Sequence, residues 1–389
     1  MSELVAPSGR VHWIGTGLST GSGLGIVCDV ATRTVLWGRT ERRAQECLAR
    51  LGLTGRAATR AYDVPALEAE VSTGDIVVSM LPATEHAGLL RLCLAHGAHF
   101  ACSSYVSAEI SSMAGAAAEA GLVALTEAGL DPGIDHLLAH ELVRRARAAI
   151  GDEAAASAAF TSYCGSLPAV PNEFRYRFSW APRGVLNALR TPARYIEQGT
   201  EQVATRPWEA TRDHVIDGEK FEVYPNRDSI PFIETYGFPD AWRRDTFLRG
   251  TLRLDGWLDA WAPVFAELRA GDDERVGALA DSLAARYPTT ESDHDRVVLS
   301  VALSVRADNG AAWSGEYVLD VVGNEHERAT TRCVSTGLAC GLWDMLAGRT
   351  APGLHQATDE PTAVQRWLTF LAEHDISCEF RHSGVRAAG

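Results

Sequence analysis

The chain has 389 residues, of which 46% are hydrophobic and 22% are charged, and its formal net charge is −14 at pH 7. This balance is typical of a soluble globular protein, and the length predicts two domains, each with an ample core. The acidic charge argues against a broad nucleic-acid or anionic-membrane surface, because such partners need basic faces. We therefore expect neither as a partner, although a local basic pocket for a small anion is compatible with this charge.

The eight cysteines are scattered, with no Cys-x-x-Cys pair and no zinc-like spacing, so we expect no metal. Residues 1–10 lack the apolar run of a signal peptide, and no apolar stretch is long enough to span a bilayer. These observations predict a reduced, cytoplasmic setting. Lys220 is the only lysine, so the positive charge is almost entirely arginine.

A predicted strand at residues 11–14 leads into a segment with five glycines between residues 15 and 25. Glycines there let backbone N–H groups approach a dinucleotide pyrophosphate at a helix N-terminus. The match to G-x-G-x-x-G is imperfect, because Thr20 occupies the third glycine position and Gly21 fits a longer spacing. A glycine-rich turn without a ligand is the alternative. As a nucleotide loop, the segment predicts cofactor contacts from Gly15, Gly17 and Leu18.

A second predicted strand at residues 34–37 ends in Gly38-Arg39-Thr40. After this strand of a Rossmann unit, an acid binds the ribose hydroxyls of NAD, whereas an arginine accommodates the 2′-phosphate of NADP. Arg39 and Thr40 therefore predict NADP (NADPH) as the cofactor, with Arg42 or Arg43 in reserve. The alternative is a solvated basic helix start.

Strands and helices alternate through the rest of the first half. Apolar runs predict strands at residues 75–82, 99–102 and 122–125, the first of them broken at Pro82, with helices at residues 84–93 and 107–120 between them. This alternation implies a Rossmann doubly wound parallel sheet, and we place that domain at residues 1–128. Ligands of such sheets bind beyond the carboxyl ends of the strands, where the chain carries Ser79, Leu81, Pro82, Ser103, Ser104 and Tyr105.

The corner Gly129-Leu130-Asp131-Pro132-Gly133-Ile134-Asp135-His136 follows the last of these strands. Pro132 cannot continue a strand ladder and Gly133 tolerates unusual backbone angles, so the chain turns here. Asp135 lies where it could cap the following helix. A turn with a helix cap needs no chemistry, which is the alternative to a functional corner. As a functional corner it adds Leu130, Asp131 and Pro132 to the predicted cofactor contacts.

The pattern changes after residue 150. Strands are predicted at five places, with a hairpin around Gln198-Gly199 and a tight turn at Asp308-Asn309-Gly310. The strands are at residues 159–165, 221–224, 246–254, 299–305 and 317–322, and helical patterns cover 257–287, 336–346 and 361–373. We expect a second α/β domain with a mixed or antiparallel sheet at residues 129–350, and a C-terminal segment, 351–389, that returns to the Rossmann domain.

The most distinctive strings of the sequence are residues 103–107, 129–136, 162–169, 178–186, 224–229 and 249–253. These six strings, in this order, resemble the saccharopine reductase family, the glutamate-forming saccharopine dehydrogenases of lysine metabolism. The likeness covers nearly the whole chain. It implies a Rossmann domain rejoined by the C-terminus, an α/β substrate-binding and dimerisation domain, hence a homodimer, and a helical insertion shortened here to about residues 257–287. The glycine loop departs from the family's usual start, which carries fewer glycines.

The resemblance implies oxidation of the CH–NH group of saccharopine by NADP⁺, giving L-glutamate and 2-aminoadipate 6-semialdehyde, or the reverse reductive condensation. This small-molecule amino-acid substrate carries three carboxylates, which suit the fixed fork of arginine. The family's substrate-binding motifs match Arg227 as the carboxylate clamp. The same correspondence gives Ser104, Tyr105, Asp131, Gly165, Gly250 and Thr251 as further substrate contacts, in one cleft between the two domains.

The amine and the attacking water must each lose a proton, so a group that titrates near neutrality is useful. Asp131, Cys164 and Tyr105 are the predicted catalytic residues, His136 is a further candidate, and we favour Asp131. Each has a structural alternative: an ammonium partner, a small buried hydrophobe, a carboxylate orienter and a core histidine, respectively. We interpret His86, which resembles a family position near the cofactor, as structural.

Two other functions stay open. Carboxynorspermidine and carboxyspermidine dehydrogenases resemble this fold, but they typically lack the Asp-His pair found here as Asp135-His136. A catalytically silent NADPH-binding regulator is the rival from another class, and the intact pocket motifs argue against it. The sequence does not fix the physiological direction of the reaction.

Overall fold

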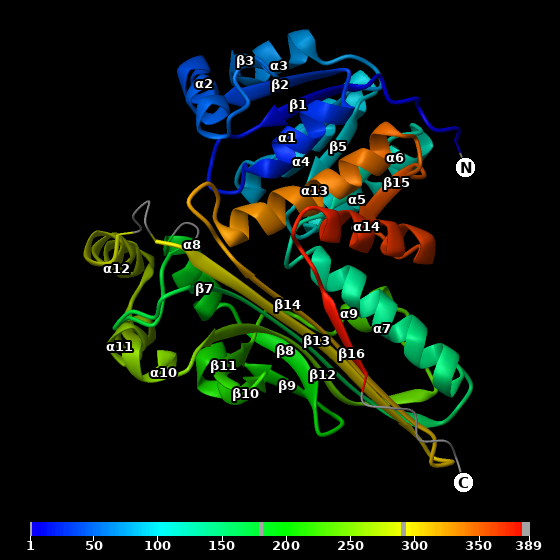
Figure 1. Ribbon diagram of the computed structural model, residues 1–389, viewed down its shortest axis with the longest axis vertical. Coiled ribbons are helices and arrows are strands. Elements are labelled where there is room, and N and C mark those ends of the chain that lie inside the picture. The colour runs from blue at the N-terminus through cyan, green and yellow to red at the C-terminus, as the bar shows by residue number, and fades with distance from the viewer. Residues whose placement is uncertain (1, 179–181, 289–292, 383–389) are drawn as a thin grey trace. The chain divides into compact units, whose positions relative to one another are not determined.

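The computed structural model describes residues 2–178, 182–288 and 293–382 (Figure 1). The chain divides into two compact units: unit 1 holds the residues up to Leu137 and Thr330–Asp375, and unit 2 holds Leu138–Ala329 and the residues from Ile376 on. From the sequence we expected domain boundaries after residues 128 and 350, with residues 351–389 returning to the first domain. In the structure, the C-terminal segment that belongs to unit 1 is Thr330–Asp375, so it both begins and ends earlier in the chain than expected.

Unit 1 is built on a seven-stranded sheet with the strand order β15-β6-β5-β4-β1-β2-β3. All neighbouring pairs are parallel, and the order reverses between β1 and β4. This is the strand order of a Rossmann fold, with one further strand, and the predicted doubly wound sheet is confirmed. The strands are β1 (Arg10–Ile14), β2 (Arg33–Gly38), β3 (Ala58–Ala61), β4 (Ile76–Ser79), β5 (His99–Cys102), β6 (Val123–Thr126) and β15 (Gly353–Gln356).

The helices of unit 1 connect these strands, and two of them come from the C-terminal part of the chain. They are α1 (Ser22–Val30), α2 (Glu41–Arg50), α3 (Val64–Glu70), α4 (Ala83–His96), α5 (Ala108–Ser112), α6 (Ala114–Glu119), α13 (Ala329–Leu346) and α14 (Pro361–Glu373). The single helix predicted at residues 107–120 is wrong in detail, because Met113 separates α5 from α6. Its predicted start is confirmed, since the Ser107 side chain accepts the N–H of Ile110.

Helix α7 (Ile134–Ile150) follows the corner after β6 and runs from unit 1 into unit 2. The prediction that Asp135 caps this helix is wrong. Asp135 is the second residue of α7, and its fully buried carboxylate accepts the N–H of Gly133 at 2.7 Å. The aspartate thus braces the turn from inside the helix.

Unit 2 is built on a nine-stranded mixed sheet with the order β10-β11-β12-β7-β13-β14-β16, and β8 and β9 branch from β12. Only the β12–β7 pair is parallel. The predicted hairpin forms between β8 and β9, with φ of 51° at Gln198 and 71° at Gly199. The strands are β7 (Ala156–Pro168), β8 (Ala193–Glu197), β9 (Thr200–Ala204), β10 (Arg212–Ile216), β11 (Glu219–Pro225), β12 (Trp242–Leu254), β13 (Asp295–Ala307), β14 (Ala312–Val322) and β16 (Glu379–His382).

The helical segment expected at residues 257–287 forms α10 (Trp257–Ala260), α11 (Ala262–Ala270) and α12 (Asp273–Arg286). Together with α8 (Pro182–Arg190), these helices enclose an aromatic core that includes Trp257, Trp261 and Phe265. Residues 179–181 of the string at 178–186 lie outside the described residues. The remaining short elements are η1 (Pro207–Ala210) and α9 (Phe232–Thr235).

Candidate active site

The loop between β1 and α1 has the backbone of a dinucleotide-binding turn. Gly15 has φ of +121°, and a Cβ there would lie 2.9 Å from the Met80 carbonyl oxygen, so only glycine fits. A Cβ at Gly17 would meet no atom within 4 Å, and Leu18 is 54% exposed. Helix α1 starts after Gly21, which has no side chain to cap it. The loop therefore leaves open backbone where a pyrophosphate would bind.

The imperfect glycine spacing has a local explanation. The buried Thr20 hydroxyl accepts the indole N–H of Trp13 at 3.2 Å and donates to the Gly15 carbonyl at 3.0 Å, so it braces the turn from within. Gly23 allows α1 to pack closely against α13, because a Cβ at Gly23 would lie 2.0 Å from the Ser335 carbonyl oxygen of α13. Figure 1 shows α1 and α13 side by side. Thr20, at the third glycine position of the G-x-G-x-x-G pattern, thus stabilises the turn, and Gly23 provides the close helix packing that the third glycine usually allows.

Arg39 lies exposed directly after β2. Over the described residues we find no hydrogen bond or ion pair to its guanidinium, whereas the neighbouring Arg42 pairs with Glu46 at 2.8 Å. The Thr40 hydroxyl caps α2 by accepting the N–H of Arg43 at 3.3 Å. Arg39 thus fits a 2′-phosphate, and Thr40 has a structural role besides the predicted cofactor contact.

A buried histidine links the carboxyl ends of β4 and β5. His86 Nδ1 lies 2.8 Å from Ser79 Oγ, and His86 Nε2 lies 2.9 Å from Ser104 Oγ. Burial lowers the pKa of His86 to about 4, so the ring is neutral, with one donor and one acceptor nitrogen. The two serines therefore take opposite hydrogen-bonding roles. The predicted residues beside them are Ser103, half-buried, Leu81, packed against the core of unit 1, and Pro82, exposed at the start of α4.

The corner after β6 brings two predicted catalytic residues together. The Tyr105 hydroxyl donates to Asp131 Oδ1 at 2.7 Å, and both side chains are half-buried. The corner is closed by a hydrogen bond from the Gly129 N–H to the Pro132 carbonyl at 2.9 Å, across the cis Asp131-Pro132 bond. A Cβ at Gly133 would lie 2.2 Å from the Gly129 carbonyl oxygen, so the turn needs glycine. Leu130 is 6% exposed, which leaves it little surface for the predicted cofactor contact.

Sequence reasoning missed Glu127, which directly follows β6. It is 1% exposed, has φ of +53°, and its Oε2 lies 2.8 Å from His136 Nε2. His136 is itself fully buried. A carboxylate at the end of an apolar strand, directly before the corner, was the signal that could have identified it.

In unit 2, the parallel pair β7–β12 brings four predicted residues together. Cys164 faces Thr251 in the strand register, and Gly165 and Gly250 follow and precede them. Cys164 is 8% exposed. A Cβ at Gly165 would lie 2.4 Å from the Leu252 carbonyl oxygen, and one at Gly250 would lie 2.6 Å from the Tyr224 carbonyl oxygen. Packing within the sheet therefore accounts for both glycines, independently of any substrate.

Arg227 lies exposed on the loop after β11, with φ of +59°. Main-chain hydrogen bonds of 2.9 Å fix this loop, from the Arg194 N–H to the Arg227 carbonyl and from the Asn226 N–H to the Arg249 carbonyl. Asp228 binds the Arg194 guanidinium at 2.8 Å. A left-handed backbone at a residue other than glycine is strained, and it persists only where its surroundings hold it.

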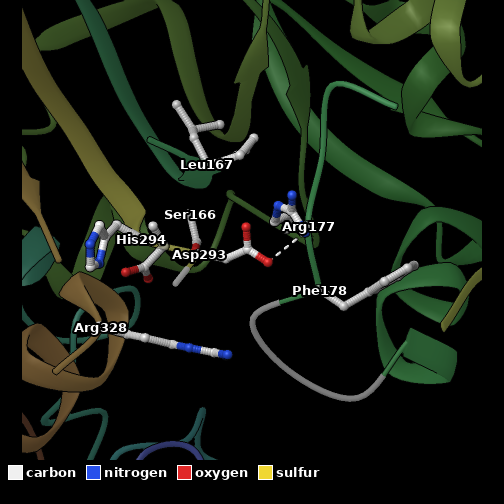
Figure 2. A pocket seen from close by; sticks show the side chains of 9 residues that line it. Ser166, Leu167, Arg177, Phe178, Asp293, His294 and Arg328 are labelled. Carbon is white, nitrogen blue, oxygen red and sulfur yellow. Dashed lines mark ion pairs between the residues drawn. The ribbon is translucent and has the colours of Figure 1, made fainter. Parts of the chain in front are cut away.

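A small pocket opens at the end of β7 (Figure 2). Arg177 pairs with Asp293 at 2.7 Å on its wall, and Figure 2 shows the Arg328 side chain extending along it. Sequence reasoning included the β7 end of this pocket but missed both arginines. Its lining residues are Ser166, Leu167, Pro168, Arg177, Phe178, Asp293, His294, Asp295 and Arg328.

Over residues 2–178, 182–288 and 293–382, no group of three or more His, Cys, Asp or Glu side chains is placed to hold a metal ion. No helix within the same ranges has the length and apolar character needed to cross a membrane.

The parallel sheet, its glycine loop and the arginine after β2 define an α/β protein of the dinucleotide-binding class. Residues 11–125 match the family model described as the saccharopine dehydrogenase NADP binding domain, and residues 129–376 match the saccharopine dehydrogenase C-terminal domain. The chain therefore belongs to the saccharopine dehydrogenase family, and the predicted resemblance and the predicted NADP cofactor are confirmed.

Known relatives agree with this assignment. The chain is 36% identical over 285 residues to the saccharopine dehydrogenase (NADP(+), L-glutamate-forming) of Pyricularia oryzae, covering 72% of this chain and 62% of that protein. It is 39% identical over 201 residues to the enzyme of the same name from Schizosaccharomyces pombe, covering 50% of this chain and 43% of that protein. The matched region thus spans less than two thirds of either relative.

A solved structure confirms the fold. Apo histidine-tagged saccharopine dehydrogenase (L-Glu forming) from Saccharomyces cerevisiae superimposes with a TM-score of 0.82 and 22% sequence identity. The match covers 96% of this chain and 100% of that chain.

Proposed function

We propose that the chain oxidises saccharopine with NADP⁺ to L-glutamate and 2-aminoadipate 6-semialdehyde, or catalyses the reverse reductive condensation, in lysine metabolism. The observation that carries the proposal is the 2.7 Å hydrogen bond between Tyr105 and Asp131 on the corner that matches the family. The names of the relatives from Pyricularia oryzae and Schizosaccharomyces pombe support it. The direction that operates in the cell stays open.

The residues of unit 1 would hold the dinucleotide. The loop from Gly15 to Gly17, which has open space at Gly17, receives the pyrophosphate, with Leu18 beside it, and Arg39 receives the 2′-phosphate. Ser79, held by His86, lies at the carboxyl end of β4, where a Rossmann sheet binds its ligand. When bound, NADP⁺ supplies the hydride acceptor.

Asp131 acts as the base in this proposal. Its carboxylate takes the proton of the secondary amine, which must leave before the carbon beside it can give up a hydride. Water then adds to the resulting imine, and the adduct collapses to glutamate and the semialdehyde. The Tyr105 hydroxyl, bound to Asp131 Oδ1, orients the carboxylate and can return a proton to the departing nitrogen. Cys164 is a further candidate for proton transfer, although its burial on β7 favours a packing role.

Arg227 is proposed as the clamp for a substrate carboxylate. Its exposed guanidinium lies on a loop fixed by main-chain hydrogen bonds to Arg194 and Arg249, which suits bidentate binding at one place. Gly250 and Thr251 lie on β12 beside Cys164 and Gly165 and would line the same site.

Initial rates with saccharopine and either NADP⁺ or NAD⁺ test the proposal. We expect saccharopine-dependent NADPH formation with a clear preference for NADP⁺. Carboxynorspermidine in place of saccharopine tests the nearest rival, and faster oxidation of that amine would overturn the assignment. Tight NADPH binding with no oxidation of either amine would instead indicate the regulator.

We further propose that unit 1 is the NADP-binding domain and unit 2 the substrate-binding and dimerisation domain of a cytoplasmic homodimer. The division of the chain into two units supports the first part. The family resemblance supports the second, and sedimentation equilibrium would measure the oligomeric state.

A further inference from the structure

Glu127 connects three segments of unit 1 through one buried carboxylate. Its Oε1 accepts the backbone N–H of Val106 and the amide N–H of Gln356, both at 2.9 Å. Its Oε2 lies 2.8 Å from Nε2 of His136. These partners belong to the loop after β5, to β15 and to the first turn of α7. The carboxylate therefore ties together the segments on either side of the corner that carries Asp131.

The backbone of Glu127 adds a second link to the same loop. Its N–H donates to the Ser104 carbonyl at 3.1 Å, while its side chain holds the N–H of Val106. Tyr105 is thus flanked on both sides by residues bound to Glu127. The position of the tyrosine hydroxyl at Asp131 depends on the path of this short loop.

The backbone conformation of Glu127 indicates that its side chain is needed for the contacts described above. With φ of +53° it occupies the left-handed region, which glycine adopts more easily than glutamate. Burial raises the pKa of this carboxyl, but hydrogen bonds from His136, Val106 and Gln356 outweigh burial and hold the pKa below its usual range. The group is therefore an ionised acceptor with its partners in place.

We propose that Glu127 is a positioning residue that holds the loop at residues 104–106 so that Tyr105 meets Asp131. The inference rests on the proposed function, because the Tyr105–Asp131 pair is the proposed proton-transfer site. It assigns a role to a residue outside the proposed cofactor and substrate contacts, which would act through Tyr105.

Glu127→Gln tests this role, since it keeps the shape of the side chain and removes its charge. We expect kcat for saccharopine to fall by about 10-fold or more, with KM for NADP⁺ within about 2-fold of wild type. The double variant Glu127→Gln/Tyr105→Phe should fall no further than Tyr105→Phe alone, because both changes remove the same interaction. Effects that multiply would overturn the proposal, since they would show Glu127 acting independently of Tyr105.

Amide hydrogen exchange gives a readout that does not depend on catalysis. We expect the peptide covering residues 103–107 to exchange about 10-fold faster in Glu127→Gln than in wild type. Unchanged exchange there would sink the inference. If wild type fails to oxidise saccharopine, the proposed function falls, and the exchange result still decides whether Glu127 holds the loop.

Asp344→Asn is the matched control. Asp344 is a buried carboxylate of unit 1 that binds Arg349, Arg366 and Trp367. We expect this variant to lower stability without faster exchange at residues 103–107. Should Glu127→Gln fail to fold, Glu127→Asp keeps the charge, shortens the reach by one methylene, and allows the same two measurements.

Discussion

The Tyr105 hydroxyl and Asp131 Oδ1 lie 2.7 Å apart, in a hydrogen bond that joins the loop after β5 to the corner after β6. These strands are neighbours in the parallel sheet. Because parallel strands end at the same edge, residues 26 positions apart in sequence meet beyond that edge. A phenol bound to a carboxylate places a proton donor and an acceptor side by side, as the amine chemistry requires.

Replacing either partner should reduce turnover, and Asp131 should matter more. Asp131→Asn removes the proposed base, and we expect kcat/KM for saccharopine to fall about 100-fold or more. Tyr105→Phe removes only the hydrogen bond, and about 10-fold is expected. Initial rates, with far-UV circular dichroism to verify folding, make the comparison. If kcat/KM falls by less than about 3-fold in Asp131→Asn, a group other than Asp131 acts as the base.

Arg39→Asp should reverse the dinucleotide preference. The variant loses a guanidinium for the 2′-phosphate and gains a carboxylate that repels it, so kcat/KM for NADP⁺ should fall about 100-fold while that for NAD⁺ rises. Arg33→Asp is the matched control, because Arg33 lies exposed at the start of β2, whereas Arg39 follows its end. An unchanged ratio of the two kcat/KM values in Arg39→Asp would reject the assignment of Arg39.

The sequence was sufficient to predict features that depend on local pattern. The Rossmann sheet follows from the alternation of apolar runs and helices, and the hairpin follows from Gln198-Gly199. The helix at Pro361–Glu373 has the bounds predicted for it. Such signals act within a few residues and need no tertiary information.

Contacts between segments that lie far apart in the sequence could not be predicted from it. Gly23 packs against Ser335, and Glu127 binds Gln356, across hundreds of positions. Likewise, the sheet needs Gly165 and Gly250 because of backbone atoms on neighbouring strands. Their motif positions suggested substrate contact, but only the strand register reveals the steric reason. Tertiary packing determines which residues fill such structural roles, and the hydrophobic periodicity of the sequence does not reveal that packing.

Two glycines of the first loop should respond differently to the same substitution. Gly23→Ala places a Cβ against the Ser335 carbonyl, where it would lie 2.0 Å away, so we expect a loss of about 1–3 kcal/mol in the free energy of unfolding. Gly17→Ala meets no atom within 4 Å and should leave stability nearly unchanged. It should instead weaken NADPH binding, because the added methyl lies where the pyrophosphate approaches. Urea denaturation and fluorescence titration measure the two effects, and equal stabilities would refute the packing role.

Arg227→Gly should separate stability from function. Glycine adopts the left-handed backbone more readily, so we expect the free energy of unfolding to be unchanged or to rise by up to about 1 kcal/mol. The lost guanidinium should raise KM for saccharopine by about 10-fold or more, with a smaller effect on kcat. Arg206→Gly, at an exposed arginine paired with Glu209, is the control for loss of surface charge. A normal KM in Arg227→Gly would exclude the clamp.

His86 should make the protein less stable as the pH falls towards 4. Its pKa is about 4 in the folded protein, against 6.5 for the free side chain. Between these values the unfolded chain takes up a proton that the folded chain does not, so stability is full above pH 6.5 and declines as pH falls, levelling off below pH 4. At pH 4.5 the expected loss from this one residue is about 2–3 kcal/mol.

His86→Asn keeps a donor and an acceptor between Ser79 and Ser104 but has no proton to take up. Urea denaturation at pH 7 and pH 4.5 measures the free energy of unfolding. Between these two pH values, the loss in this variant should be smaller than the loss in wild type by about 2–3 kcal/mol. His326→Asn, at a histidine whose side chain is 83% exposed, should leave the pH dependence of wild type intact. Parallel pH profiles for wild type and His86→Asn would mean that the buried ring already carries its proton at pH 4.5.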